Sequence, residues 1–307
     1  MSDIHLSLKP PVFRSNEEDW LATQAGYLKE LTKVAGISGG MGSSLPILCG
    51  GDVFDKWNSP AELINFAIRY LPHLYAVPGQ HDLPHHNYKD IRKSAYWTLV
   101  EAGKIQTLEI QEGHPQTIEG TDQLAIWGYP WGDLVRPCPT PHSLYLDVCI
   151  SHSYIWTEKT GYPGAPPEQR LKVYKRKLRG YDVALFGDNH CPVSFNLDKS
   201  ADTVTVFNPG GFMRRTVDQL AHRPRVGILY NDGSVEPYYL DISRDVVNEK
   251  QIQSIGKSGR MDALIDVLKN ISTGSTDFEA EVKKALNRMN PNEEVRRLVL
   301  ACLEVGK

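Results

Sequence analysis

The feature that most constrains this chain is an ending that recurs along it. Four apolar runs of strand length stop at acids, amides or histidines, often after a glycine: "ILCGGD", "YAVPGQHD", "VCISH" and "ALFGDNH". A single ending of this kind is an ordinary turn, because Asp and Asn after Gly are standard turn residues. Several in one chain are typical of an open α/β sheet, in which sites gather outside the carboxyl ends of strands.

The side chains at these endings share one kind of chemistry. Carboxylates, imidazoles and an amide oxygen suit a pair of divalent ions such as manganese, iron, zinc or magnesium. Two ions about 3.5–4 Å apart can clamp a phosphoryl group and generate a hydroxide nucleophile. Asp3 and His5 belong to the same set, since in an extended chain their side chains share a face. Taken singly, each ending favours a turn, a cap or a buried histidine; together they favour a metal site.

Composition sets broad limits. The chain has 307 residues, of which 41% are hydrophobic and 23% charged, an ordinary soluble mixture. Its net charge of −3 gives no overall basic field, so nucleic-acid binding would require a local basic patch. The five cysteines form no CxxC pair, which argues against a disulfide framework and favours a reducing cytoplasm. No signal peptide and no membrane-length apolar run is apparent.

The order of predicted elements indicates two parts. Strands alternate with helices over residues 1–245, which predicts an α/β domain. Helices are expected at residues 20–34, 60–71, 91–103 and 166–180, the first capped by Ser15 with Glu18 and the second by Ser59 with Glu62. A hairpin should turn at Asn231-Asp232-Gly233. Over residues 246–307 strand signals stop, and three short helices predict a small helical segment that could bind a partner.

The order of the polar endings resembles the calcineurin-like metallophosphoesterase superfamily, whose pattern is D-x-H, G-D-x-x-D, G-N-H-D/E, a lone H, and G-H-x-H. The resemblance covers about residues 3–225. It implies a sandwich of two mixed β-sheets flanked by helices, with metals at the strand ends. It also implies two sets of ligands joined by a bridging Asp52: Asp3, His5 and His190 on the first metal, and Gln80, His152 and Asp188 on the second.

The resemblance implies roles for three further residues. His81 would lie beside the substrate phosphate and either stabilise the transition state or protonate the leaving group. Asp82 and Asp55 would orient His81 and the loop after Asp52. We therefore expect His81 and Asp82 to serve catalysis without binding a metal.

Three positions depart from the family pattern. Gln80 replaces an Asn and Asp188 replaces a His, and both changes fall on the second metal. The longer amide and the shorter carboxylate could compensate, which would favour manganese or magnesium over zinc; the competing interpretation is a weakened second site. Only Met1 and Ser2 precede Asp3 where the family has a full apolar strand. Either that strand is cut short or the true start lies upstream, and a poorly ordered N-terminus would leave Asp3 loosely held.

Within the superfamily the chain is most similar to SbcD-type nuclease subunits, in a phage-like form, which work with SMC-like ATPases in DNA repair. The stretches "SDIHLS", "GDVFD", "ISHSY" and "NPGGFMRRT" carry this likeness. It implies a manganese-dependent DNA nuclease acting by direct attack of a metal-bound hydroxide. It also implies DNA and a coiled-coil ATPase as partners, allows a homodimer, and places the protein in the cytoplasm, that of a host if a phage encodes it.

The residues themselves support a DNA substrate only weakly. Arg214 and Arg215 follow a strand end and could meet phosphates. The basic helix at residues 170–179 is equally explained as a solvated face. Aromatic residues in "IWGYPWG" could stack on bases, although core packing is favoured, and His85 and His86 are more simply loop residues. A small-molecule phosphoesterase and a catalytically silent scaffold remain as alternatives.

Overall fold

The structure is a computed structural model that describes residues 1–36, 45–108, 114–118, 121–142, 144–162, 164–197 and 204–248. The chain divides into two compact units, Met1–Val247 and Asn248–Lys307, and all the described helices and strands belong to the first. The predicted helices of the C-terminal segment lie outside the described residues, so that segment and its boundary stay predictions. None of the described helices has the length and hydropathy needed to cross a membrane.

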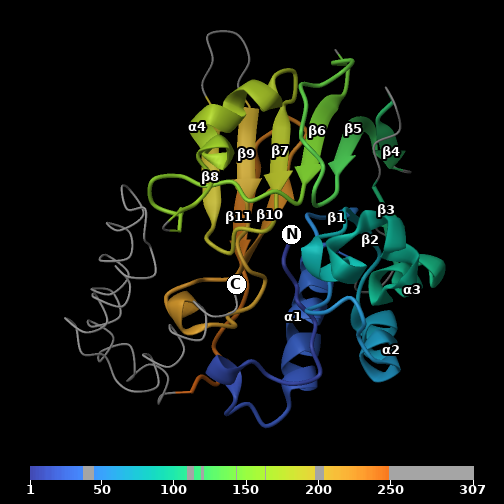
Figure 1. Cartoon of the computed structure of the whole chain (residues 1–307), viewed down its shortest axis with the longest axis vertical. Coiled ribbons are helices and arrows are strands. Elements are labelled where there is room, and N and C mark those ends of the chain that lie inside the picture. The colour runs from blue at the N-terminus through green and yellow to red at the C-terminus, as the bar shows by residue number, and fades with distance from the viewer. Residues whose placement is uncertain are drawn as a thin grey trace, which may run out of the picture. The chain divides into compact units, whose positions relative to one another are not determined.

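Three β-sheets form the framework of the first unit (Figure 1). The largest is a mixed sheet of six strands in the order β4-β5-β6-β7-β9-β8, with β5, β6, β7 and β9 parallel and the two edge strands antiparallel to them. Its strands are β4 Gln116–Ile118, β5 Thr121–Tyr129, β6 Leu146–Ser151, β7 Val183–Phe186, β8 Val193–Leu197 and β9 Val204–Asn208.

The other two sheets are smaller. A parallel sheet contains β1 Ile47–Cys49, β2 Leu74–Ala76 and β3 Ile105–Thr107, and an antiparallel hairpin contains β10 Arg225–Leu229 and β11 Val235–Tyr239. The predicted mixed α/β fold, with several sheets flanked by helices, is confirmed. The number of sheets differs from the expected two, because among the described strands β1 pairs only with β2 and β10 only with β11.

Helices cover the outer faces of the sheets (Figure 1). The α-helices are α1 Trp20–Val34, α2 Ala61–Tyr70, α3 Ala95–Glu101 and α4 Leu171–Tyr174. Short 3-10 helices lie between them: η1 Val12–Arg14, η2 Gln80–Asp82, η3 Pro84–His86, η4 Tyr88–Lys93, η5 Pro167–Gln169, η6 Lys175–Leu178 and η7 Val217–Gln219. The basic helix expected at residues 166–180 is therefore three short pieces, and the helix expected at 91–103 is broken before α3.

The predicted helix caps need correction. The side chain of Asp19, not that of Ser15, accepts a hydrogen bond from the first turn of α1, at the amide of Ala22. Ser15 is too far upstream, because it ends η1. The N-cap of α2 is Pro60, and the hydroxyl of Ser59 donates to the carbonyl of Lys56. Local side-chain bonds of this kind compete with capping, which explains the difference at Ser59.

The core lies in three clusters. One packs α1, α2 and α3 against the three-stranded sheet, and a second packs α4 and η6 against the six-stranded sheet. A third fills the space between the sheets, with Val77, Ile126, Val148 and Val183 buried in it. The faces of the sheets are thus covered, and what remains for function is the edge at which the parallel strands end.

The first residues of the chain are held along β1. The amide of Asp3 donates to Gly51 O at 2.9 Å, and that of His5 donates to Asp52 O at 3.0 Å. The side chain of Asp3 is fully buried, as is that of Ser2. Asp3 is therefore firmly placed, and the looseness considered from the sequence does not arise in this structure.

Candidate metal centre

The predicted ligands meet where the carboxyl ends of β1, β2, β6 and β7 converge. Asp52 follows β1, Gln80 follows β2, and His152 follows β6. Three groups of side chains have ligand atoms within 4.8 Å of one another: Asp3, His5 and His190; Asp3, Asp52 and His152; and His5, Asp55 and His81. Parallel strands place their carboxyl ends at one edge, which is why residues so far apart in sequence come together.

The first half of the centre joins Asp3, His5 and His190. The Nε2 atoms of His5 and His190 lie 3.1 Å apart, and Nε2 of His190 lies 3.6 Å from Oδ1 of Asp3. Two imidazole nitrogens at this distance need either a shared proton or a cation between them. A divalent ion beside the Asp3 carboxylate would satisfy both rings.

Asp52 lies between this first half of the centre and a second half, which consists of Gln80, His152 and Asp188. Its Oδ2 lies 3.7 Å from Nε2 of His5 and 3.4 Å from Nε2 of His152. Its Oδ1 accepts a hydrogen bond from the amide of His81 at 2.9 Å, which fixes the carboxylate and leaves Oδ2 facing both histidines. This is the position required of a ligand that bridges two ions.

The tautomer of His152 is set from outside the centre. Its Nδ1 hydrogen-bonds the carbonyl of Gly50, so the neutral ring carries its proton there. Nε2 lies on the side of Asp52 and can bind a metal ion once it gives up the proton that it shares with that carboxylate. A backbone carbonyl behind a ligating histidine is the usual arrangement in metal sites.

Gln80 and Asp188 lie together beside this second half. Nε2 of Gln80 donates to Oδ1 of Asp188 at 2.9 Å, and the Gln80 Oε1 atom has no hydrogen-bond partner. Asp188 is absent from the three close groups and is instead tied to Asp3, whose Oδ1 accepts a hydrogen bond from the Asp188 amide at 3.2 Å. The longer amide therefore reaches the shorter carboxylate, as compensation requires.

Unpartnered buried atoms test whether divalent ions fit. Four acceptor atoms of the predicted ligands have no hydrogen-bond partner: Asp3 Oδ2, Asp52 Oδ2, Gln80 Oε1 and His152 Nε2. Buried polar atoms are normally paired, and leaving one unpaired costs about 1–3 kcal/mol. Carboxylate and amide oxygens and imidazole nitrogens gathered in this way are what divalent cations bind. The residues present thus fit the metal pair that the sequence predicts.

The backbone at the centre is strained. Six non-glycine residues of the described chain have positive φ, and all lie at or near this centre: Asp3, His5, Asp52, His85, His86 and Asp188. Such conformations cost roughly 1–2 kcal/mol each and cluster at functional sites. Glycine is required at Gly79 and Gly187, where a Cβ would overlap the Asp52 carboxylate and the Ser2 hydroxyl respectively.

Burial and neighbouring charge act against each other on the pKa values of these groups. Burial opposes ionisation of Asp52, but the charge of His152 and its contact outweigh it, and the pKa of Asp52 is lowered. Burial likewise opposes protonation of His152, yet the Asp52 carboxylate raises the pKa of His152 to about 10. For His5 burial dominates and lowers the pKa to about 4. The Asp52–His152 pair therefore carries a proton that a metal ion would displace.

His81 is held for a role beside the ions. Its Nδ1 lies 2.8 Å from the carbonyl of Asp55, so the neutral ring donates there and Nε2 is left for a substrate. Its ring meets that of His5 edge to face, with centroids 4.9 Å apart. The backbone of Asp55, and not its carboxylate, orients His81.

Asp82 lies behind the centre, in a position from which it can orient its neighbours, the role that the resemblance implies for it. Its carboxylate is fully buried and accepts from the amides of Val53, Phe54 and Gly79 at 3.2, 3.1 and 3.0 Å. Burial, followed by the charge of Asp52, raises the pKa of Asp82 to about 7. Asp82 thus joins the loop after β1 to the loop after β2 and positions Asp52 and His81, instead of facing a reacting atom.

Arg214 and Arg215, which were expected to meet phosphates, are engaged within the protein. The Arg214 guanidinium donates to Asp245 at 2.8 Å and to the carbonyl of Leu220. That of Arg215 donates to Asp55 at 2.7 Å and to the carbonyl of His5. Both side chains are nearly buried. Arg215 supports the loops that carry His5 and Asp55, and Arg214 anchors the residues before Val247.

Several supporting residues were missed from the sequence. Asn189 donates to the carbonyl of Ile155, and Asn208 donates to the carbonyl of Asn189, which holds the loop carrying Asp188 and His190. In the sequence, Asn189 stands inside "GDNH" and Asn208 stands just before "PGG". An Asn beside a Gly or Pro is equally typical of an ordinary turn, so neither residue pointed to the site. Trp57 was missed altogether, and it lies against His85 with ring centroids 5.5 Å apart.

Comparison with known proteins gives a family and little beyond it. No match is found among curated proteins. The sulfate thiohydrolase SoxB of Thermus thermophilus, solved with glycerol, is 12% identical with a TM-score of 0.43; the match covers 84% of this chain and only 58% of SoxB. The phosphopantetheinyl hydrolase PptH of Mycobacterium tuberculosis is 14% identical with a TM-score of 0.31, over 57% of this chain and 84% of PptH. Neither likeness is close enough to carry an argument about this chain.

The family model is more informative, because it spans the strand ends that form the metal centre. The model for calcineurin-like phosphoesterases matches residues 1–192, well over half of the 307 residues, and this range includes every predicted ligand. Together with the mixed α/β fold and the cluster of carboxylates and imidazoles, this match establishes that the chain belongs to the calcineurin-like phosphoesterase family.

Proposed function

We propose that this phosphoesterase is a DNA nuclease of the SbcD type, which cleaves phosphodiesters and works with an SMC-like coiled-coil ATPase in the cytoplasm. The family makes the protein a hydrolase with candidate metal ligands. The observation that carries the nucleic-acid proposal is the aromatic rim beside His81, formed by Trp57, His85, His86 and Trp131.

The aromatic rim consists of two ring pairs. Trp57 lies against His85 and Trp131 against His86, each with centroids 5.5 Å apart. Both histidines are exposed and belong to η3, which directly follows the turn carrying His81. The amide of Trp131 donates to the carbonyl of Pro78 at 3.0 Å, which ties this side of the rim to the same loop. Stacking on such rings contributes about 1–3 kcal/mol per base and tolerates any sequence.

The chemistry follows from the geometry of the donors. Two divalent ions, when bound, would polarise the phosphoryl group and activate a water for in-line attack. Asp3, His5 and His190 would hold one ion, Gln80, His152 and Asp188 the other, and Asp52 both. In its doubly protonated form His81, with Nδ1 donating to the Asp55 carbonyl, would present its Nε2 proton to a phosphoryl oxygen or transfer that proton to the leaving oxygen. We expect no covalent enzyme intermediate.

The second half of the centre favours hard ions. Its donors would be oxygens of Asp52, Gln80 and Asp188 with a single imidazole nitrogen, from His152. Carboxylate and carbonyl oxygens suit manganese and magnesium better than zinc. We therefore propose manganese as the working ion, with magnesium as the next best.

A local basic surface adds modest support. On α4, η6 and the residue after them, Lys172, Arg176 and Arg179 are exposed, while Leu171 and Leu178 pack inward. A row of exposed cations of this kind attracts a polyanion in a salt-dependent way. The described cysteines are free, in keeping with a reducing compartment. The ATPase partner and a homodimer rest on the sequence likeness alone.

A substrate comparison tests this proposal. Purified protein with manganese is offered labelled single- and double-stranded DNA and, separately, bis-p-nitrophenyl phosphate, with and without the ATPase. We expect cleavage of DNA, and a variant with Trp57→Ala and Trp131→Ala should bind single-stranded DNA roughly 5- to 100-fold more weakly. Trp97→Ala, at a half-buried position on α3, is the matched control. Turnover of the small ester with inert DNA would overturn the nuclease and indicate a small-molecule phosphoesterase.

A further inference from the structure

Two consecutive histidines that follow the turn carrying His81 have a backbone conformation that is uncommon outside glycine. His85 and His86 have φ values of +51 and +58, in the left-handed region that glycine and asparagine tolerate best. In the described chain the other non-glycine residues with positive φ are all predicted metal ligands: Asp3, His5, Asp52 and Asp188. Strain of this kind clusters at functional sites, so the imidazoles of this pair call for a role.

The backbone fixes the pair relative to the metal centre. The amide of Leu83 donates to the carbonyl of Gln80 at 3.3 Å, and the amide of His86 donates to the carbonyl of Leu83 at 3.1 Å. The tight turns therefore continue without a break from a predicted ligand to the histidines. Leu83 and Pro84 are buried beneath these turns, which anchors them to the core.

Each histidine also packs against a tryptophan from a different loop. Trp57 follows β1 and lies against His85, and Trp131 follows β5 and lies against His86, each with ring centroids 5.5 Å apart. Both histidines are exposed, and neither imidazole makes a hydrogen bond to another described residue. The tryptophans thus hold the two rings beside the centre, and the ring nitrogens stay available to a ligand.

The chemistry of the pair favours an anion over a metal ion. Among the described residues, the groups of ligand atoms close enough to hold a metal do not include either imidazole. An imidazole donates a hydrogen bond whether it is neutral or protonated. The nearby carboxylate of Asp90 is paired with Lys93 and accepts a hydrogen bond from Asn87, which offsets its charge. Two adjacent N–H donors suit a phosphate oxygen.

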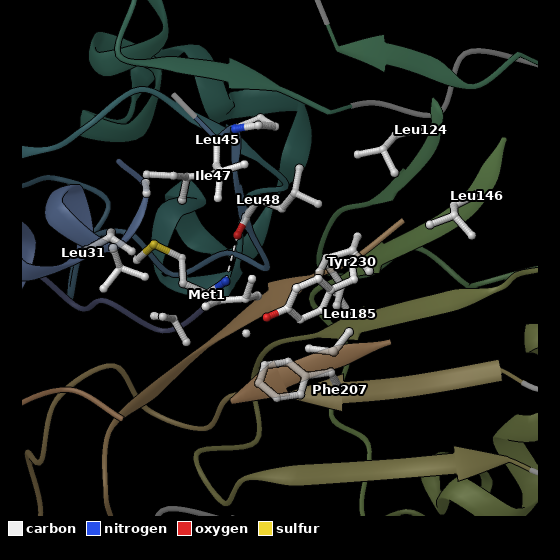
Figure 2. A pocket seen from close by; sticks show the side chains of 18 of the residues that line it. Met1, Leu31, Leu45, Ile47, Leu48, Leu124, Leu146, Leu185, Phe207 and Tyr230 are labelled. Atoms are coloured by element: carbon white, nitrogen blue, oxygen red, sulfur yellow. Dashed lines mark hydrogen bonds between the residues drawn. The ribbon is translucent and has the colours of Figure 1, made fainter. Parts of the chain in front are cut away.

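An apolar cavity in another part of the described chain is unsuited to an anion (Figure 2). Its volume is about 490 Å³, and apolar side chains such as Leu31, Leu185 and Phe207 line it. The amino group of Met1 reaches this cavity but already donates to Leu48 O at 2.8 Å. A phosphate would lose its hydration there without gaining free donors. The exposed histidines are therefore the better place for an anion.

We propose that His85 and His86 form a second phosphate subsite, which binds the phosphate next to the one that reacts at the metal centre. The inference deepens the proposed function and rests on it for the phosphoryl group at the metals. It adds that the preferred substrate carries at least two phosphates, as a nucleic-acid strand or a nucleoside bisphosphate does. Trp57 and Trp131 would hold the histidines and stack on a base, while the histidines donate to the second phosphate.

Calorimetric binding of nucleotides tests the subsite without any turnover. The manganese-loaded full chain is titrated with thymidine 3′,5′-bisphosphate and, separately, with thymidine 3′-monophosphate and thymidine 5′-monophosphate. We expect the bisphosphate to bind roughly tenfold more tightly than the better monophosphate, the effect of hydrogen bonds to a charged group. In a variant with His85→Asn and His86→Asn this advantage should disappear, while the binding of both monophosphates stays unchanged.

Two results would overturn the subsite. One is a bisphosphate that binds the wild type no more tightly than the monophosphates do, and the other is an advantage that persists in the double variant. Because asparagine tolerates the left-handed region, the midpoint of thermal unfolding of the variant should be unchanged or higher. A lower midpoint with the advantage retained would show that the histidines only support the turn.

His73→Asn is the matched control. His73 is exposed and packs against Tyr75 at the amino end of β2, whereas Gln80 follows the carboxyl end of that strand. This variant should keep the full advantage of the bisphosphate. The nuclease can fail separately: inert DNA, together with an advantage that His85→Asn and His86→Asn remove, would overturn the nuclease and support the subsite.

Discussion

The two halves of the metal centre are built differently. In the first half, His5 and His190 point nitrogen atoms at each other across 3.1 Å, an arrangement that gains from a cation between them. In the second half, Gln80 and Asp188 are bonded to each other at 2.9 Å. The first half is thus held open for an ion, whereas the second is partly satisfied without one.

This difference bears on the order of binding. An ion entering the first half relieves opposed lone pairs and joins Asp3, which is fixed by its backbone. An ion entering the second half must displace a proton from the Asp52–His152 pair but can keep the Gln80–Asp188 bond, because Gln80 Oε1 is free. We expect the first half to bind its ion more tightly, and the second to discriminate more strongly between metals.

Replacing the shared ligand Asp52 should have the largest effect on turnover and metal binding, since both halves of the centre depend on it. Asp52→Asn takes a charge from both halves, and we expect turnover of bis-p-nitrophenyl phosphate to fall at least about 10³-fold. Calorimetric titration with manganese should show weaker binding of both ions. Asp90→Asn, on η4, serves as control and should behave as wild type. Loss of one ion alone would show that Asp52 does not bridge.

Replacing His81 should separate catalysis from metal binding. His81→Ala removes the ring held by the Asp55 carbonyl, and turnover should fall about 10²- to 10⁴-fold, the usual contribution of a general acid. Both ions should still bind, because the bond to Asp52 comes from the His81 backbone. Near wild-type rates would mean that the role assigned to His81 is wrong.

Paired substitutions test whether Gln80 and Asp188 compensate. Gln80→Asn shortens the amide and Asp188→Ala removes the carboxylate, and each should weaken the second ion by roughly tenfold, the effect of losing one charge-assisted hydrogen bond or ligand. Gln80→Asn combined with Asp188→His should bind better than either Gln80→Asn or Asp188→His alone and shift preference towards zinc. Calorimetric titration gives the number of ions bound by each variant. If Asp188→Ala still binds two ions with unchanged affinity, Asp188 is not a ligand.

The dependence of binding on pH should distinguish the halves more subtly. His152, with its pKa raised to about 10, is protonated near pH 7, and a metal ligand must be neutral. Binding in the second half should therefore release a proton, and its affinity should rise up to about tenfold per pH unit between pH 6 and 9. In the first half His5, with a pKa of about 4, is already neutral, whereas burial is outweighed by the Asp3 carboxylate in raising the pKa of His190, so any release there comes from His190 alone. Calorimetry in buffers of different ionisation enthalpy measures the number of protons released when metal binds. Zero release at pH 7 would contradict the assignment of His152 as a ligand of the second ion.

Much of this centre could be predicted because its signals are local. Asp52, His152 and His190 follow short apolar runs, and strand ends in an α/β sheet converge whatever the details of packing. The hairpin turn was equally readable: Gly233 has φ +81, and Tyr230 accepts from the amide of Gly233 while its own amide donates to Ser234. Helix caps were less secure, since Ser15 and Asp19 offer the same chemistry a turn apart.

The sequence alone therefore determined which residue types stand at the strand ends and in what order, and with them the family and the expectation of two metals. Only the tertiary structure decided the pairings: Gln80 with Asp188 across 108 positions, Arg215 with Asp55 across 160, and Asp82 with three backbone amides. Local structure depends on residues that are neighbours in the sequence, whereas these contacts depend on how distant segments pack against each other. A short stretch of sequence does not determine that packing.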